Sequence, residues 1–172
     1  MELKTKRLLL RPVKHADSKA IFEYRSDKKA NQYQGFVPET VEEVSAFISK
    51  LPAGFNVEGT WFQLVVILEP EHQIIGDVGL HFIQDQNDTV ELGCTISKSF
   101  QGNGFATEAL TSIKDFLLHE LGKKKLKGSV DPRNLASIKM LKNIGMSQID
   151  FYEKSYNLKG EWVDDAVYQL AV

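Results

Sequence analysis

Hydrophobic positions along this chain fall either in short apolar runs or at helical spacing, and each pattern marks a different kind of element. Runs rich in β-branched and aromatic residues are typical of strands, and they occupy residues 60–68, 73–83 and 89–96. Only four residues separate the first two segments, which is too short for a crossover helix. The pattern therefore predicts an antiparallel meander of three strands in the middle of the chain.

The N-terminal part of the chain predicts one short strand and two helices. The strand covers residues 8–11 and should stop at Pro12, and helical spacing follows over about 17–26. Thr40 and Glu43 form the T-x-x-E pattern of a capping box directly ahead of an apolar stripe at helical spacing. We therefore expect a second helix to begin just after Thr40.

The C-terminal part alternates helices and strands. Helical periodicity is strongest over 105–121, and a short strand should end near Val130. Asn134 is placed to open another helix, and two strands are expected around a turn at 157–160. The resulting order, βααβββαβαββ, predicts a single α+β domain over the 172 residues, with a mixed, mostly antiparallel sheet flanked by helices.

Composition narrows the possible partners. The chain has 21 Lys and Arg residues against 23 Asp and Glu residues, so a formal charge of −2 provides no strong field for nucleic acid or an anionic membrane. No apolar run reaches the ~20 residues that span a bilayer, and the N-terminus has no signal-peptide pattern. A cytoplasmic protein is expected. The sequence does not distinguish a monomer from a homodimer.

Metal and disulfide chemistry find little support in the sequence. Cys94 is the one cysteine, which excludes an internal disulfide and a zinc cluster built from cysteines. The four histidines show no H-E-x-x-H spacing, so no metal site is expected. Cys94 alternates with Leu92 and Ile96, which favours a small core residue over a nucleophile that carries an acyl group.

A glycine-rich loop at residues 101–106 joins the last strand of the meander to the long helix. The first turn of a helix leaves backbone N–H groups unpaired and carries the positive end of the helix dipole, so this position favours an anion. Gly102 and Gly104 allow close approach of a phosphate, because no Cβ intervenes. The alternative is a loop that only reverses the chain.

Three kinds of phosphate-binding loop can be compared with this segment. The G-x-x-x-x-G-K-[ST] pattern of a Walker A loop is absent. The dinucleotide pattern G-x-G-x-x-G fits Gly102 and Gly104, but Thr107 replaces the third glycine, and Asp131 lies further on than the usual ~20 residues for a ribose-binding acid. The preceding meander also differs from a βαβ unit. The third candidate, an acetyl-CoA loop, fits better.

The loop resembles the signature Q/R-x-x-G-x-G/A of the GNAT superfamily of acetyl-CoA-dependent N-acetyltransferases, which Gln101, Gly104 and Ala106 match. The run QGNGFATEAL at 101–110 is similar to the RimJ/RimL-type branch. Four further segments share that similarity, in the family's order along nearly the whole chain: Thr5 to Pro12, Tyr24 to Asp27, Glu91 to Gly93 and Asn134 to Ser137. Gly145-Met146 stands where the family usually has Gly-Phe.

The resemblance implies a GNAT (acyl-CoA N-acyltransferase) fold and a binding site for acetyl-CoA. Backbone amides of the loop would hold the pyrophosphate, and the free edge of a splayed strand would pair with the pantetheine arm. Asn134 and Ser137 would flank that arm from the other side, although Asn134 is also a good helix N-cap. The implied cofactor-binding residues are Cys94, Thr95, Ile96, Gln101, Gly102, Asn103, Gly104, Phe105, Ala106, Thr107, Asn134 and Ser137.

The reaction expected from the resemblance is direct attack of a primary amine on the acetyl thioester in a ternary complex. An alkyl amine has a pKa near ~10, so a base must remove its proton. Glu91 is the candidate base, with a merely structural cross-strand ion pair as the alternative. Leu141 stands where many relatives have a tyrosine, so Ser137 is the hypothesis for the proton donor to the thiolate, ahead of Tyr156 and Tyr152.

The acceptor is the least determined part of the prediction. The resemblance places Arg25, Asn31 and Tyr33 at the acceptor site, but a peptide N-terminus and a small-molecule amine both remain open. A non-catalytic CoA-binding sensor or scaffold is the alternative function. The basic run 123–127 is either the solvated end of a helix or a contact for the 3′-phosphate of CoA.

Overall fold

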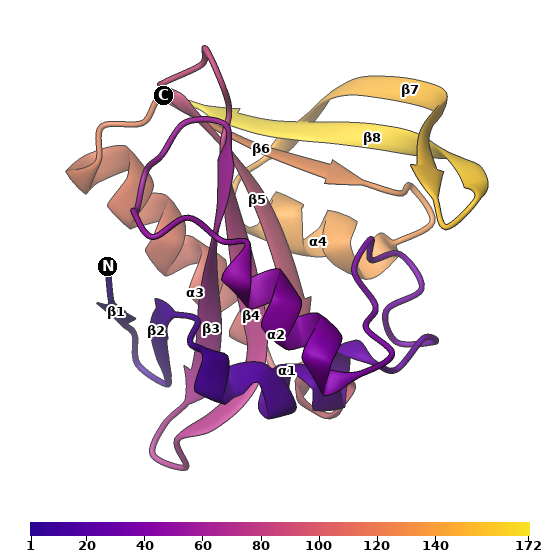
Figure 1. Ribbon diagram of the computed structural model, residues 1–172. Helices are drawn as coiled ribbons and strands as arrows, with labels where there is room; N and C mark the ends of the chain where they lie inside the picture. Colours follow the sequence, from indigo (N-terminus) through magenta and orange to yellow (C-terminus); the bar gives the residue numbers. More distant parts are fainter.

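An eight-stranded sheet organises the molecule, and its strand order is β1-β2-β3-β4-β5-β6-β8-β7 (Figure 1). The structure is a computed structural model that covers residues 1–172. The strands are β1 (Leu3–Lys4), β2 (Leu8–Pro12), β3 (Thr60–Leu68), β4 (Gln73–Phe82), β5 (Thr89–Ile96), β6 (Lys125–Val130), β7 (Ser147–Leu158) and β8 (Glu161–Ala171). All neighbouring strands are antiparallel except β5 and β6, which are parallel. The chain therefore has the predicted α+β class with a mixed, mostly antiparallel sheet.

Helices cover both faces of this sheet. They are α1 (Ser18–Arg25), α2 (Val41–Ser49), α3 (Phe105–Asp115) and α4 (Leu135–Asn143). The α1–α2 pair packs on one face, and α3 packs on the other, beside α4 (Figure 1). No helix is both long and apolar enough to cross a membrane.

The alternating pattern of the central strands explains the two layers of the core. On one face, Leu64, Val78 and Leu92 belong to a cluster of 24 buried residues that also includes the apolar stripe of α3. On the other face, Val65 and Ile67 belong to a smaller cluster under α1 and α2. Successive side chains of a strand point to opposite faces, so one strand supplies both layers.

The pairing of β5 with β6 is short, and this is the feature that shapes the site. The parallel register covers only Thr89↔Lys125, Val90↔Leu126 and Glu91↔Lys127. Beyond Glu91 the strands diverge, and β6 continues with β8 and β7 as a separate wing of the sheet (Figure 1). The segment Leu92 to Ile96 is thus left without a ladder partner on its β6 side, which confirms the predicted splay.

Three local predictions need correction. The short strand β1 was not expected, because its two residues carry no periodic signal. The helix predicted over 105–121 is regular only to Asp115, and the next turn is widened so that the Leu121 N–H donates to the Phe116 carbonyl at 3.0 Å. Only half of the capping box forms, because the Glu43 carboxylate accepts from the Glu39 N–H at 2.8 Å instead of from Thr40.

Candidate active site

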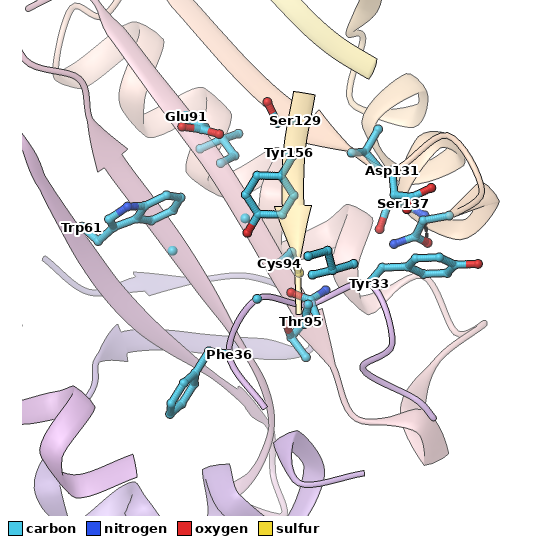
Figure 2. Close-up of a pocket in the computed structure, with 18 of the residues that line it drawn as sticks. Tyr33, Phe36, Trp61, Glu91, Cys94, Thr95, Ser129, Asp131, Ser137 and Tyr156 are labelled. Atoms are coloured by element: carbon cyan, nitrogen blue, oxygen red, sulfur yellow. Dashed lines mark hydrogen bonds between the residues drawn. The ribbon is translucent and has the colours of Figure 1, made fainter. Parts of the chain in front are cut away.

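Two cavities meet at the opening between β5 and β6. The first has a volume of about 900 Å³ and the second about 600 Å³. Figure 2 shows the opening with residues of both walls. Seven residues line both cavities: Tyr33, Gln34, Cys94, Thr95, Asn134, Ser137 and Met140. A molecule in one cavity would therefore contact a molecule in the other at this opening.

The glycine-rich loop and the start of α3 form one wall of the second cavity. Gly102 and Gly104 both have φ = +79°, a conformation that L side chains rarely adopt. The backbone N–H groups of residues 102–107 donate to no acceptor in the protein. The Gln101 amide donates to the Ile96 carbonyl at 2.8 Å and so holds the loop against the end of β5. A row of free N–H groups at a helix N-terminus is suited to a phosphate.

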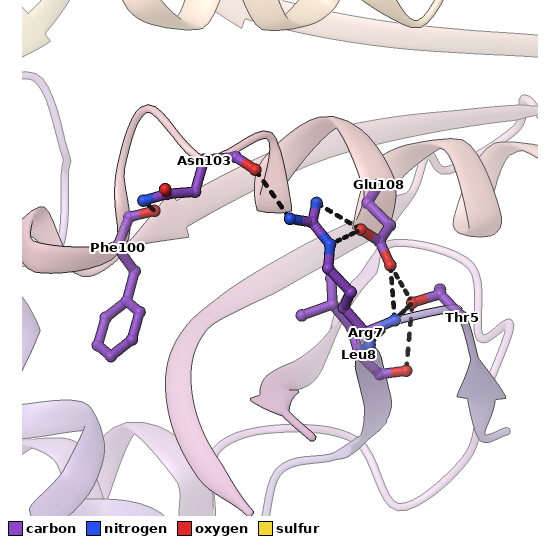
Figure 3. Close-up of polar contacts among 6 residues, drawn as sticks. All are labelled: Thr5, Arg7, Leu8, Phe100, Asn103 and Glu108. Atoms are coloured by element: carbon purple, nitrogen blue, oxygen red, sulfur yellow. Dashed lines mark hydrogen bonds and ion pairs between the residues drawn. The ribbon is translucent and has the colours of Figure 1, made fainter. Parts of the chain in front are cut away.

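Arg7 braces this loop from β2's side, and sequence reasoning missed it. Its guanidinium donates to the Asn103 carbonyl at 3.1 Å and forms an ion pair with Glu108 at 2.6 Å (Figure 3). It also stacks over the Phe105 ring. Burial favours the neutral form of Glu108, but hydrogen bonds from Thr5 and Arg7 outweigh it and lower its pKa. Arg7 thereby compensates a negative charge that lies in the first turn of α3.

Cations complete the lining of the second cavity. Lys29, Lys98 and Lys139 line it, whereas no Asp or Glu does. The basic run at 123–127 lines neither cavity, and the Lys123 ammonium donates to the Asn87 carbonyl at 2.6 Å. The idea that this run reaches a 3′-phosphate is therefore not supported. The second cavity has the charge that an anionic ligand needs.

Thr95 supplies an independent indication that a ligand occupies the opening. The residue is 6% exposed, lines both cavities, and its hydroxyl oxygen has no hydrogen-bond partner in the protein. Leaving a buried hydroxyl unpaired costs roughly 1–3 kcal/mol, so such groups normally have a partner. A polar chain passing along the free edge of β5 would provide one. The residues present at the opening and at the loop therefore fit a ligand such as CoA.

Glu91 lies in the first cavity, on the face opposite to Val90 and Leu92 as predicted. Its carboxylate is 3.2 Å from the His81 Nδ1 atom on β4, and the His81 ring stacks on Trp61 with centroids 4.8 Å apart. The structure is compatible with both interpretations of Glu91. The residue has a cross-strand partner, as a structural ion pair requires, and it lines an open cavity, as a general base requires. No local pattern in the sequence points to His81, although the antiparallel register places it directly opposite Glu91.

Arg25 lines the first cavity, but its guanidinium is hydrogen-bonded to groups of the protein itself. It donates to the Asp77 carboxylate at 2.8 and 2.6 Å and to the Phe36 carbonyl at 3.2 Å. Burial disfavours the charged form, but the charge and hydrogen bonds of Asp77 prevail and raise the pKa of Arg25. These contacts make Arg25 a brace for the segment before α2, and a contact with substrate stays a prediction.

The other two residues expected at the acceptor site differ in placement. Asn31 is buried, and its amide donates to the carbonyls of Tyr24 and Asp27 at 2.7 and 3.0 Å. It lines the second cavity and not the first. Tyr33 lines both, which suits a residue between two substrates. Asn31 therefore supports the turn that carries Tyr33.

The candidate proton donors differ in whether they line the two cavities. Ser137 lines both cavities, and Tyr156 lines the first (Figure 2), whereas Tyr152 lines neither and donates to the Asp150 carboxylate at 2.5 Å. Leu141 packs over Gly128 of β6, where an added Cβ would come within 2.9 Å of it. Of the three candidate donors, Ser137 and Tyr156 thus line the cavities and Tyr152 does not.

Two further side chains have structural roles here. Asn134 caps α4, because its side-chain oxygen accepts from the Ser137 N–H at 3.2 Å. Cys94 packs against the core, and burial raises the pKa of its thiol to about 12, with the charge of Asp77 adding to the rise. A thiol with so little thiolate is a poor nucleophile, which agrees with the expectation of a core residue.

Comparisons with known proteins are consistent with this geometry. A family model described as an acetyltransferase (GNAT) domain matches residues 7–147. The uncharacterized N-acetyltransferase YnaD of Bacillus subtilis (strain 168) is 31% identical, over 99% of this chain and 96% of the relative. The crystal structure of a GNAT-family acetyltransferase from Bacillus anthracis has a TM-score of 0.88 at 25% identity, covering 99% of this chain and 98% of that one. The fold also matches Mycobacterium smegmatis RimJ in complex with CoA-disulfide, with a TM-score of 0.83 at 19% identity, covering 96% and 82%.

Proposed function

The chain belongs to the GNAT acetyltransferase family, and from this premise we propose that it transfers the acetyl group of acetyl-CoA to a primary amine by direct attack in a ternary complex. The observation that carries the proposal is the meeting of two cavities at the β5–β6 opening, one of them formed by a row of free backbone N–H groups. Two adjoining cavities allow two substrates to be bound at once, which a ternary mechanism requires.

Acetyl-CoA is proposed to bind in the second cavity. Backbone N–H groups of residues 102–107 hold the pyrophosphate, and Lys29, Lys98 and Lys139 add positive charge around it. The pantetheine arm lies along the free edge of β5 from Leu92 to Ile96, in the manner of an added strand. Binding through backbone amides explains how a chain of net charge −2 can hold a strongly anionic cosubstrate.

Catalysis is proposed to use two side chains at the opening. The amine nitrogen attacks the thioester carbonyl carbon, Glu91 takes a proton from the amine, directly or through water, and the carbon–sulfur bond breaks. Ser137, which lines both cavities, donates a proton to the departing thiolate. Tyr156, also on the wall of the first cavity, is the alternative donor. Cys94 carries no acyl group in this scheme.

The proposed function is tested by acetyl-CoA binding and by thiol release. Millimolar acetyl-CoA is expected to raise the Tm, because a ligand that binds only the folded state stabilises it by mass action. Adding a panel of primary amines should then release free CoA thiol, measured with a chromogenic disulfide. A Tm shift without thiol release from any amine would identify a CoA-binding sensor or scaffold instead. Absence of both signals would contradict the proposal.

Replacing Gly104 by valine is expected to weaken acetyl-CoA binding roughly 10- to 100-fold, because hydrogen bonds to a charged group contribute about 1.5–3 kcal/mol each. The φ of +79° disfavours any L side chain, so the loop must shift, and its N–H groups then no longer point toward the phosphate. Isothermal titration calorimetry gives the affinity. Gly160→Val is the matched control, since Gly160 has φ = +91° in the β7–β8 turn and lines neither cavity. Equal affinities for both variants would assign the loop a structural role only.

A further inference from the structure

The first cavity has an acidic wall. Four carboxylates line it, Glu91, Asp131, Asp164 and Asp165, and the cations in its lining are Arg25 and Lys50. Asp164 and Asp165 come from β8, across the opening from Glu91 on β5. The ion pairs that these residues form decide how much of this negative charge is compensated.

Two of the charges are compensated by partners within the protein. Arg25 is matched by Asp77 at 2.6 Å, and Asp131 is matched by Arg133, also at 2.6 Å. Neither Asp164 nor Asp165 forms an ion pair. Three acidic residues without a lysine or arginine partner thus line the cavity, together with the exposed Lys50, and Glu91 has only His81 beside it.

The Asp164 carboxylate of β8 is held in place by the local backbone. The β7 strand has an irregular register between Tyr152 and Tyr156, and Lys154 within it has φ = +44°. This bulge directs the Lys154 N–H to the Asp164 carboxylate at 2.8 Å. Burial raises the pKa of Asp165 and the charge of Glu91 adds to the rise, while hydrogen bonds from Ser129 and from the Val130 backbone oppose it. A cation placed between the two strands would relieve this repulsion.

Aromatic surface complements the acidic wall. Trp61 and Tyr156 line the same cavity, with the Trp61 residue 40% exposed (Figure 2). The indole lies over Gly79 and Gly93, where an added Cβ would come within 3.0 and 3.8 Å of it. Aromatic faces attract alkylammonium groups through cation–π interaction and also pack on methylene chains. Carboxylates and aromatic rings together form a surface for a flexible cationic chain.

The two cavities differ in the sign of their lining charges. The second has three lysines and no carboxylate, whereas the first has an excess of carboxylates. This contrast keeps an anionic cosubstrate out of the first cavity and favours a cation there. The volume of about 900 Å³ lies within the range of small-molecule sites and leaves room for a diamine or a longer polyamine.

From these observations we propose that the acceptor is a small diamine or polyamine, whose second ammonium group is bound by Asp164 and Asp165 while the first amine faces Glu91. This inference rests on the proposed acetyl transfer and names its substrate class. A simple monoamine leaves the two aspartates unpaired, and an acceptor with a carboxylate is repelled by them. The carboxylates of β8 therefore act as specificity-determining residues.

Three acceptors of matched length test the inference with the wild-type enzyme: 1,4-diaminobutane, butylamine and 4-aminobutanoate. The loss of one charge-assisted interaction lowers affinity roughly 10- to 100-fold. The value of kcat/KM should therefore fall by at least about 10-fold from the diamine to butylamine, and further for the amino acid. Thiol release gives the rates. Equal kcat/KM values for all three would overturn the inference, as would a short peptide with a neutral side chain that outcompetes the diamine.

Two variants assign the effect to β8. Asp164→Asn and Asp165→Asn should each raise KM for 1,4-diaminobutane about 10-fold, while butylamine changes less than about 2-fold. Asp85→Asn is the control for net charge, because Asp85 is exposed in the β4–β5 turn and lines neither cavity. Its positive φ of 59° also tolerates asparagine. Unchanged KM for the diamine in both β8 variants would contradict the assignment.

The outcomes separate this inference from the proposed function. Thiol release with butylamine at the same rate as with the diamine removes the substrate class but leaves acetyl transfer standing. Absence of thiol release with every amine removes the proposed function itself. The comparison of acceptors uses unmodified enzyme, so it does not depend on the folding of any variant.

Discussion

Replacing Glu91 by glutamine is expected to lower kcat about 100-fold or more at pH 7, the usual contribution of a general base. Glu91 is half-buried in the first cavity, beside His81 at 3.2 Å. Glutamine keeps the shape of the side chain but accepts no proton, so an ammonium group stays protonated in the complex. Thiol release under saturating acetyl-CoA and acceptor gives kcat directly.

The pH dependence of this variant identifies the role of the carboxylate. An alkyl amine with a pKa near ~10 is increasingly neutral as the pH rises, so the deficit of Glu91→Gln should narrow between pH 7 and about 9.5. Asp85→Asn, which removes an exposed carboxylate outside both cavities, is expected to keep wild-type rates. A change confined to KM would instead assign Glu91 to holding the acceptor, and an unchanged kcat would exclude it as the base.

Replacing Asp77 by alanine is expected to destabilise the fold by about 3–5 kcal/mol, because it leaves a buried guanidinium without its partner. The Asp77 carboxylate is 2% exposed and accepts hydrogen bonds from Tyr24, from Arg25 and from the Gln63 amide. For a domain of this size the loss corresponds to a fall in Tm of roughly 10 °C, measured by scanning calorimetry.

The same network connects stability to the site. Arg25 also binds the Phe36 carbonyl, so the loss of Asp77 should loosen the segment that carries Tyr33 and raise KM for the acceptor. Glu39→Ala is the control, since its ion pair with Lys28 at 2.9 Å is between exposed side chains and should leave Tm nearly unchanged. If Asp77→Ala had the same Tm as the wild type, the buried ion pair would have no role in stabilising this face of the sheet.

Local patterns in the sequence were sufficient for the element order apart from β1, and for the position of the glycine-rich loop. Runs of β-branched and aromatic residues defined β3 to β5, because these strands are buried on both faces over much of their length. The glycines of the loop at 101–106 needed no tertiary information either, since a positive φ is a property of single residues. The widened turn after Asp115 was not predictable, because its residues are ordinary helix formers.

Contacts between distant residues carried no signal in the sequence. Arg7 is about 100 positions from Glu108, and Asp77 is 52 positions from Arg25. Of the expected acceptor residues, Arg25 lines the first cavity and Asn31 only the second, and the fold uses the polar atoms of both for internal hydrogen bonds. Pairing of this kind depends on how the elements dock, which single-residue patterns do not describe.

The sequence by itself determined the α+β class, the loop at the start of α3, the family resemblance and Glu91 as a residue facing away from the core. Only the tertiary structure decided which charges remain uncompensated around the opening, and it brought Asp164 and Asp165 of β8 into the cavity that Glu91 lines. The physical reason is that hydrophobic periodicity specifies which face of each element is buried. The charge of a cavity depends instead on strand register and on where β5 and β6 part, which the packing of the whole sheet decides.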